Sequence, residues 1–234
     1  MARIVVLRCG DAVQEVSARR GEFASWIRVG VGDAWGGKWA EHDLREDAPP
    51  PAAGSAAAFV LTGSSSNVTE RASWMLRAES YLRDLAGSGA PVLGICFGHQ
   101  LMASALGGRV EKNLCGREIG TVTATKIADD PLFDAIPDPF TVNASHVETV
   151  CTLPFGARIL AKTELDACAA FAIGERVRCV QFHPEFDGDV MRGYIGARAT
   201  VMRAEGLDPE AATGRAHDAH GPSILRNFVR AFVR

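Results

Sequence analysis

The sequence predicts a single α/β domain with a mostly parallel sheet, helices on both of its faces, and a mixed or antiparallel extension. Three observations carry this prediction: continuous apolar runs of strand length in the N-terminal half, a segment with helical spacing between two of them, and a series of shorter strand-like runs after residue 108. We expect the domain to span residues 1–234, with a motif-bearing core over about 4–186 and a helical extension over about 189–234.

The N-terminal half contains the signals of a parallel sheet. Ile4–Leu7, Ala57–Leu61 and Pro91–Ile95 are continuous apolar runs, the pattern of strands that are buried on both faces. Large apolar residues recur at helical spacing in Thr69–Leu85, between the second and third runs. A strand, a helix and a strand in this order imply a right-handed parallel crossover. We expect Glu41–Gly54, which contains three consecutive prolines, to be a surface loop.

The second half changes character after a short helix that runs through Leu106 to Gly107 and Gly108. The runs that follow are short and linked by turns, which is typical of a mixed or antiparallel continuation of the sheet; they are Glu118–Ile127, Thr141–Asn143, Ala157–Thr163, Ala167–Ile173 and Val177–Phe182. Helix formers return from Asp189 onwards, are interrupted at Gly206–Pro222, and end in an amphipathic segment, Ile224–Val233.

The composition argues against several classes of partner. With 25 Lys and Arg against 28 Asp and Glu, the formal net charge is −3, so the chain carries no general basic excess for nucleic acid or an acidic membrane surface. No apolar stretch approaches the roughly 20 residues that cross a bilayer. The N-terminal apolar run is too short for a secretory signal, and we therefore expect the 6 cysteines to be reduced thiols in the cytoplasm.

The most informative motif is Gly94–Gly98, a G-x-C-x-G turn between an apolar strand and a helix. Glycines on both sides allow a sharp strand-to-helix turn, which projects the central Cys96 from the edge of the sheet. A thiol at a helix N-terminus is favoured as the thiolate, and the N–H groups there, including that of Phe97, can stabilise an oxyanion. The alternative is an inert cysteine buried in a tight turn.

A second strand-like run ends in His183, Pro184 and Glu185. A cysteine nucleophile needs a base that a third group orients, and such partners are often distant in sequence; here the separation is 183 − 96 = 87 residues. Proline biases the residue before it towards an extended conformation, so His183 and Glu185 can lie on the same side of the backbone. Alone, this tripeptide would more often be a turn with a surface ion pair, but together with Cys96 it indicates a catalytic triad.

These segments, from about Ile4 to Phe186, resemble the class I, or triad, glutamine amidotransferases, and within them the amidotransferase domain of GMP synthase. The resemblance implies a flavodoxin-like α/β fold with Cys96 as nucleophile, His183 as base and Glu185 as the orienting acid. It assigns the backbone N–H groups of Ser64 and Phe97 to an oxyanion hole. It also assigns substrate binding to five residues: Gly63, Gln100, Ser145, His146 and Val147.

The sequence departs from the commonest family pattern at two places. The oxyanion loop reads Gly63-Ser64-Ser65 where many members have Gly-Gly-Pro, and His146 is followed by Val147-Glu148 where GMP synthase relatives have Gly-Asp.

The mechanism that the resemblance implies is attack of the Cys96 thiolate on the side-chain amide of glutamine, followed by hydrolysis of a γ-glutamyl thioester. We expect neither a cofactor nor a metal for this chemistry.

Three functional hypotheses follow. In the first, the protein releases ammonia from glutamine or a related γ-glutamyl compound and passes it to a synthetase on a separate chain, since no nucleotide-binding acceptor domain is recognisable here. The second is a γ-glutamyl peptide hydrolase that needs no acceptor. The third is a non-catalytic module that binds a partner or metabolite on the same fold.

Several other patterns are better explained as structure. We expect Gly63–Ser66 not to cradle a phosphate, because no lysine follows at the required spacing. We expect Trp35–Trp39 to be a turn with two packed indoles, and the histidines of His217–His220 to be solvated side chains rather than metal ligands. Buried or structural positions are also expected for a second group: Glu118, Cys115, Cys151, Cys168 and Cys179.

Overall fold

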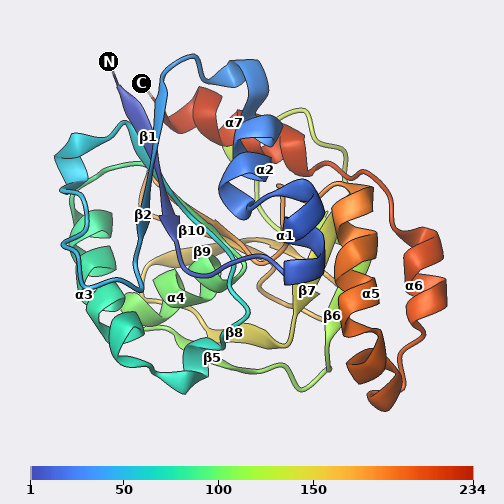
Figure 1. Cartoon of the computed structure of the whole chain (residues 1–234). Coiled ribbons are helices and arrows are strands. Elements are labelled where there is room, and N and C mark those ends of the chain that lie inside the picture. The colour runs from blue at the N-terminus through green and yellow to red at the C-terminus, as the bar shows by residue number, and fades with distance from the viewer. Residues whose placement is uncertain (1, 234) are drawn as a thin grey trace.

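The computed structural model describes residues 2–233 and shows a sheet of 9 strands in the order β2-β1-β3-β4-β11-β10-β9-β6-β7 (Figure 1). The pairs from β2 to β11 are parallel, and those from β11 to β7 are antiparallel. The strands are β1 (Arg3–Arg8), β2 (Lys38–Asp43), β3 (Ala58–Leu61), β4 (Val92–Ile95), β6 (Glu118–Lys126), β7 (Phe140–His146), β9 (Ala157–Lys162), β10 (Ala170–Ile173) and β11 (Val177–Val180). Two further strands, β5 (Arg109–Lys112) and β8 (Glu148–Thr152), form a separate antiparallel pair.

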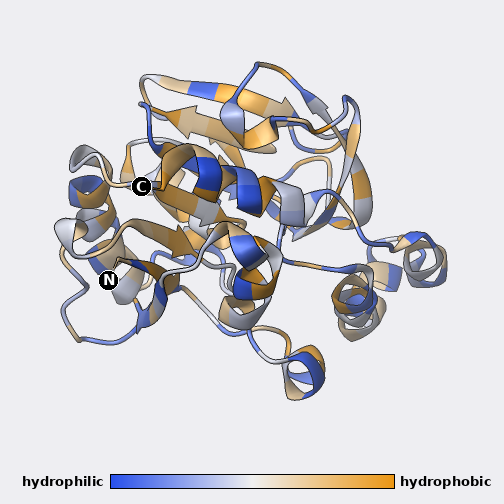
Figure 2. Cartoon of the chain, turned by 90° about the horizontal axis from the view of Figure 1, so that it is seen from above, coloured by the Kyte–Doolittle hydropathy of each residue, from blue (hydrophilic) through white to orange (hydrophobic). Residues whose placement is uncertain are grey.

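Helices cover both faces of the sheet because the strands are apolar on both faces. In β1, Ile4 and Val6 pack against one group of helices, and Val5 and Leu7 pack against the other. Viewed from above, hydrophobic residues are concentrated in the strands between these layers (Figure 2). The first group is α2 (Phe23–Val31) and α7 (Gly221–Phe232), and the second is α3 (Ser73–Gly87) and α4 (Phe97–Ala105).

A third apolar cluster joins the segment after β1 to the segment after β11. Phe23 and Trp26 pack here with Phe186 and with Tyr194. The cluster includes three more helices, α1 (Gln14–Arg20), α5 (Gly188–Ala204) and α6 (Pro209–Arg215). Of these, α5 and α6 lie together at one side of the molecule (Figure 1).

The structure confirms the predicted fold class, a single-domain α/β fold with a parallel sheet and an antiparallel extension. All of the predicted strands lie within or next to observed ones, and the predicted helix at Thr69–Leu85 corresponds to α3 preceded by a 3₁₀ turn at Val68–Glu70. Among the described residues, no helix is long and apolar enough to span a membrane.

Two local predictions are wrong, and one strand pair was not predicted. The expected loop at Glu41–Gly54 begins inside β2, whose exposed and half-buried residues pair with β1 at the edge of the sheet. The interruption at Gly206–Pro222 contains α6, which Asp208 caps through a hydrogen bond from the N–H of Ala211. The pair β5 and β8 was also missed, because short strands of mixed polarity have no clear period.

The cysteine predictions are partly wrong. All 6 cysteines are free thiols, and burial raises the pKa of Cys168 to about 12. Cys179 is likewise buried, but Cys115 and Cys151 are exposed and are not core residues.

The two indoles of the Trp35–Trp39 segment pack as predicted. Both side chains lie against the apolar cluster around α2 and α7.

A buried ion pair anchors β11, the strand that leads to His183. The guanidinium Nε of Arg178 lies 2.9 Å from Oδ1 and 3.0 Å from Oδ2 of Asp130. The same carboxylate accepts a hydrogen bond from the N–H of Leu132 and pairs with Arg158 at 3.0 Å. Both Asp130 and Arg178 are buried, so neither charge can turn to water if its partner is lost.

We expect Asp130→Ala to lower the free energy of unfolding by about 3–5 kcal/mol, because it leaves the Arg178 charge buried without a partner. Urea unfolding followed by circular dichroism measures this change. Glu210→Ala, which removes the partner of exposed Arg203, is the matched control and should leave the midpoint nearly unchanged. Equal effects of the two substitutions would contradict the prediction.

Candidate active site

Cys96 lies in a strained backbone conformation between β4 and α4. Its φ of 50° and ψ of −102° are rare for a residue with a side chain. The conformation is held by hydrogen bonds from the Cys96 N–H to the Val180 carbonyl at 2.8 Å and from the Gly98 N–H to the Thr62 carbonyl at 3.2 Å. The turn therefore presents the thiol at the N-terminus of α4, at the carboxyl ends of the parallel strands.

The glycines on either side of Cys96 are needed for close backbone contact. A Cβ atom at Gly94 would lie 2.8 Å from the carbonyl oxygen of Gly98. A Cβ atom at Gly98 would lie 2.9 Å from the carbonyl oxygen of Leu61 in β3. Both distances are too short for a side chain, which agrees with the crowding that the sequence predicted for this turn.

His183 and Glu185 follow β11 and form a buried hydrogen-bonded pair. The His183 Nδ1 lies 2.8 Å from Oε1 of Glu185, and both side chains are nearly inaccessible to solvent. The imidazole stacks on Phe186 with a centroid distance of 3.9 Å. The backbone N–H of His183 donates to the backbone carbonyl of Asn143 at 2.7 Å. These contacts hold the imidazole ring next to Gly63. A Cβ atom at Gly63 would lie 2.8 Å from Cε1 of His183.

The charges of Cys96 and His183 stabilise each other. Burial raises the pKa of the Cys96 thiol, but the charge and hydrogen bonding of His183, with the charge of His146, outweigh it, so that the pKa lies below its ordinary value. Burial lowers the pKa of His183, but the charges of Glu185 and Cys96 outweigh it and raise the pKa to about 10. The imidazolium of His183 therefore favours the thiolate form of Cys96.

His146 is a second buried cation next to the site. Its Nε2 lies 3.0 Å from Oε2 of Glu118, and its Nδ1 lies 3.0 Å from the carbonyl oxygen of Glu148. Both partners are acceptors, and only the protonated imidazole can donate to both. Burial lowers the pKa of His146, but hydrogen bonding to Glu118 and the charge of Asp166 raise it above its usual range. Glu118, predicted to be structural, thus holds the His146 charge in place.

A cavity of about 240 Å³, which we call the thiol cavity, opens over Cys96. Among the predicted site residues, seven line it: Ser64, Cys96, Phe97, Gln100, Ser145, His146 and Val147. The other three predicted residues, Gly63, His183 and Glu185, belong to the same site through the contacts of the His183 ring. The structure therefore brings together residues from β7 and from the segments that follow β3, β4 and β11.

Sequence reasoning missed one neighbour of Cys96 and several residues that line the cavity. Gln181, directly before the Phe182-His183 segment, donates from Nε2 towards the Cys96 sulfur at 3.6 Å. Its side-chain oxygen accepts from the Nε2 of Gln100 at 2.9 Å. The motif context could have indicated Gln181. The other missed residues are Ser65, Ser66, Asn67, Arg117, Glu148 and Arg198. Ser65, Ser66 and Glu148 lie within two residues of predicted site residues, whereas the other three had no recognisable signal.

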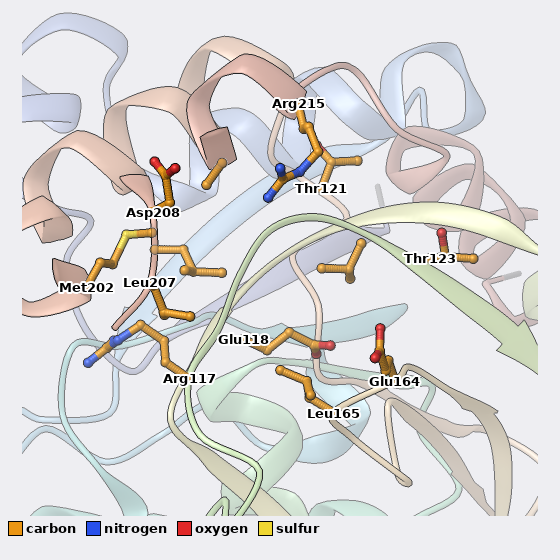
Figure 3. Close-up of a pocket in the computed structure, with 13 residues that line it drawn as sticks. Arg117, Glu118, Thr121, Thr123, Glu164, Leu165, Met202, Leu207, Asp208 and Arg215 are labelled. Atoms are coloured by element: carbon orange, nitrogen blue, oxygen red, sulfur yellow. The ribbon is translucent and has the colours of Figure 1, made fainter. Parts of the chain in front are cut away.

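A larger hollow of about 360 Å³ adjoins the thiol cavity, and Arg117 borders both. Figure 3 shows side chains from β6 and from the α5–α6 segment around this hollow, among them Glu118, Leu207 and Arg215. The hollow was not predicted, because it depends on how α5 and α6 pack beside β6.

The residues of the histidine-rich loop have separate partners. The His217 ring bonds to the carbonyl of Arg215 at 2.8 Å, and Asp218 accepts from the N–H of Gly188 at 2.8 Å. The Nδ1 of His220 lies 3.2 Å from the backbone nitrogen of Thr141, so this half-buried ring is not simply solvated. Within residues 2–233, no group of three or more His, Cys, Asp or Glu side chains could hold a metal ion.

The fold and the cysteine turn together define an amidotransferase-like α/β protein. The family model described as glutamine amidotransferase class-I matches residues 39–198. The chain belongs to this family.

Curated relatives include enzymes of two kinds. Gamma-glutamyl peptidase 4 of Arabidopsis thaliana is 33% identical over 182 residues, which cover 74% of this chain and 72% of that protein. The glutamine-hydrolysing GMP synthase subunit of Halobacterium salinarum is 34% identical over 146 residues, or 61% of this chain and 74% of that protein. The chain covers only 33% of the GMP synthase of Idiomarina loihiensis, to which it is 36% identical.

Solved structures support the fold. A glutamine amidotransferase from Thermotoga maritima superposes with a TM-score of 0.74 at 22% identity, covering 99% of this chain and 96% of the other. A glutamine amidotransferase from Methylobacillus flagellatus gives a TM-score of 0.70 at 17% identity, with 99% and 94% of the two chains covered.

We expect Glu118→Gln to shift the pH profile of Cys96 alkylation to higher pH. Loss of the carboxylate lowers the pKa of His146, and loss of the His146 charge then raises the pKa of the thiol. The rate of modification by iodoacetamide, followed at Cys96 by mass spectrometry, measures the midpoint. Glu111→Gln, on the exposed β5 strand, should leave the midpoint in place. An unchanged profile in Glu118→Gln would show that His146 does not act on the thiolate.

Proposed function

We propose that Cys96, His183 and Glu185 form a catalytic triad that hydrolyses the side-chain amide of glutamine or of a γ-glutamyl compound. The observation that carries this proposal is the buried His183–Glu185 pair beside a thiol whose pKa is lowered by the His183 charge. A base oriented by a carboxylate and paired with an activated thiol is the arrangement that nucleophilic acyl transfer needs. Membership in the class-I family supports the same chemistry.

The reaction follows from the positions of these groups. The Cys96 thiolate attacks the amide carbon, and the N–H groups of Ser64 and Phe97 stabilise the oxyanion that forms. His183 gives its proton to the departing nitrogen, which breaks the C–N bond and leaves a γ-glutamyl thioester. His183 then takes a proton from water, whose oxygen attacks the thioester and releases glutamate and the thiolate. Glu185 keeps the imidazole in the orientation that both steps require.

The γ-glutamyl end of the substrate is proposed to lie against the segment around Ser145 and against Gln100. The amide nitrogen of Gln100 already donates to the Glu148 carbonyl and to Gln181, so its side-chain oxygen is the group left to accept from the substrate ammonium. The Ser145 hydroxyl is buried and makes no hydrogen bond within residues 2–233. We assign the backbone groups of Gly63, His146 and Val147 to contacts with the γ-glutamyl end of the substrate.

The fate of the nitrogen distinguishes two versions of this function. In the amidotransferase version, ammonia from glutamine passes to a synthetase on a separate chain; the similarity to the GMP synthase subunit of Halobacterium salinarum supports this version. In the peptidase version, the leaving group is an amino acid or peptide and no acceptor is needed. The similarity to gamma-glutamyl peptidase 4, which covers 74% of this chain and 72% of that protein, supports the peptidase version.

We expect Cys96→Ala to reduce glutamate release from glutamine and from γ-glutamyl dipeptides by at least about 10³-fold, because no other group can form the thioester. Glutamate is measured by a coupled dehydrogenase assay. Cys151→Ala, which removes an exposed thiol, is the matched control and should retain full activity.

A glutamine-mimicking electrophile provides an independent readout. It should label the wild type at Cys96 and fail to label Cys96→Ala, as seen by peptide mass mapping. If the wild type released no glutamate from any of these substrates and Cys96 remained unlabelled, the catalytic proposal would be wrong and a non-catalytic binding role would be favoured.

A further inference from the structure

Arg198 of α5 lines the thiol cavity, and no carboxylate of the described residues pairs with it. No hydrogen bond or ion pair joins its guanidinium to any other side chain within residues 2–233. Its guanidinium carbon lies over the ring of Tyr194, 5.0 Å from the centroid. The side chain is half-buried, and its burial lowers the pKa of Arg198 below the usual value.

Arg198 differs in this respect from the other arginine of the thiol cavity. Arg117, the second guanidinium of the cavity, pairs with Glu205 through contacts of 2.7 and 3.1 Å. Arg203, further along the same helix, pairs with exposed Glu210. A half-buried cation without a counterion, facing a cavity, is a site that an anion can complete.

The position of Arg198 indicates which part of a substrate it would meet. The ring of Tyr194 lies 6.3 Å from that of His183, and the same ring contacts Arg198. His183 must stand next to the leaving nitrogen to protonate it. Arg198 and His183 thus share Tyr194 as a neighbour, which we take to place Arg198 on the side of the leaving group.

There is also room for a leaving group larger than ammonia. The hollow in Figure 3 adjoins the thiol cavity at Arg117, between β6 and the α5–α6 segment. Ammonia would use neither this space nor a guanidinium. An amino acid or short peptide brings both a bulky body and a carboxylate, and a carboxylate suits the planar donor set of arginine.

We propose that Arg198 binds the carboxylate of the leaving group, and that the preferred substrates are γ-glutamyl amino acids or short γ-glutamyl peptides rather than glutamine. The inference rests on the proposed triad chemistry and specifies its substrate. Water and a γ-glutamyl peptide give glutamate and the free amino acid or peptide, with His183 supplying the proton to the leaving nitrogen and recovering it from water.

Three substrates and two variants test the proposal. The substrates are γ-glutamylglycine, γ-glutamylglycinamide, in which the leaving-group carboxylate is blocked, and glutamine. The variants are Arg198→Gln and, as the matched control on the same helix, Arg203→Gln, which removes an exposed guanidinium away from the cavity. The value of kcat/KM is measured for each combination.

The wild type and Arg203→Gln should cleave γ-glutamylglycine at least roughly 10-fold better than its amide, because a charge-assisted contact is lost in the amide. Arg198→Gln should remove this preference and leave the hydrolysis of glutamine within about 2-fold of the wild type. An equal loss for all three substrates would overturn the proposal, since it would indicate that Arg198 binds the α-carboxylate or only supports the fold. A wild type without a preference for the free carboxylate would overturn it as well.

Binding separates failure of this proposal from failure of the triad. In a Cys96→Ala background, calorimetry should show γ-glutamylglycine binding roughly 10-fold more weakly when Arg198→Gln is added, with no change for the amide. If this difference were seen but the wild type cleaved nothing, the carboxylate site would stand and the triad proposal would fail. If the wild type cleaved all three substrates and binding did not depend on Arg198, the triad would stand and the carboxylate site would fail.

Discussion

The proposed chemistry of this protein depends on one constraint of the sheet, the parallel pairing of β4 with β11. Ile95 and Val180, the last residues of these strands, lie opposite each other, and the Cys96 N–H donates to the Val180 carbonyl. The chain leaves both strands at the same edge, so the thiol and the His183 imidazole meet although 183 − 96 = 87 residues separate them. Because both groups are buried there, each charge stabilises the other, and this proximity lowers the pKa of the thiol below its ordinary value.

The surroundings keep these charges buried and in position. Glu185 accompanies His183, and Glu118 accompanies His146, so each imidazolium has a carboxylate within hydrogen-bond distance. Such pairs are costly to bury unless their hydrogen bonds are satisfied. Gln181 adds a neutral donor towards the sulfur and ties Gln100 to the site. The β6–β7 pairing that places Glu118 opposite His146 therefore acts on Cys96 without touching it.

The C-terminal helices give the site its individual character. They join α1 and α2 in an apolar cluster around Phe186 and Tyr194, which fixes α5 beside the segment that carries His183. This packing brings Arg198 to the cavity and creates the adjoining hollow. A family motif in a shared fold does not define the substrate; the groups placed around it do. Here these groups come from a part of the chain whose sequence shows only helix formers.

Sequence by itself determined the fold class and singled out Cys96, His183 and Glu185 as the proposed triad, because these inferences depend on short-range chemistry. Glycines at 94 and 98 permit one sharp turn, Pro184 restricts its neighbour, and apolar runs of strand length have few ways to be buried. Only the tertiary structure decided which polar and charged groups surround Cys96. The Glu118–His146 pair, the Gln181 contact and unpaired Arg198 come from residues that share no motif. The edge strand β2 and the exposure of Cys115 were misjudged for the same reason. Burial and charge pairing are set by neighbours that are remote in sequence, and only the packed chain brings those neighbours together.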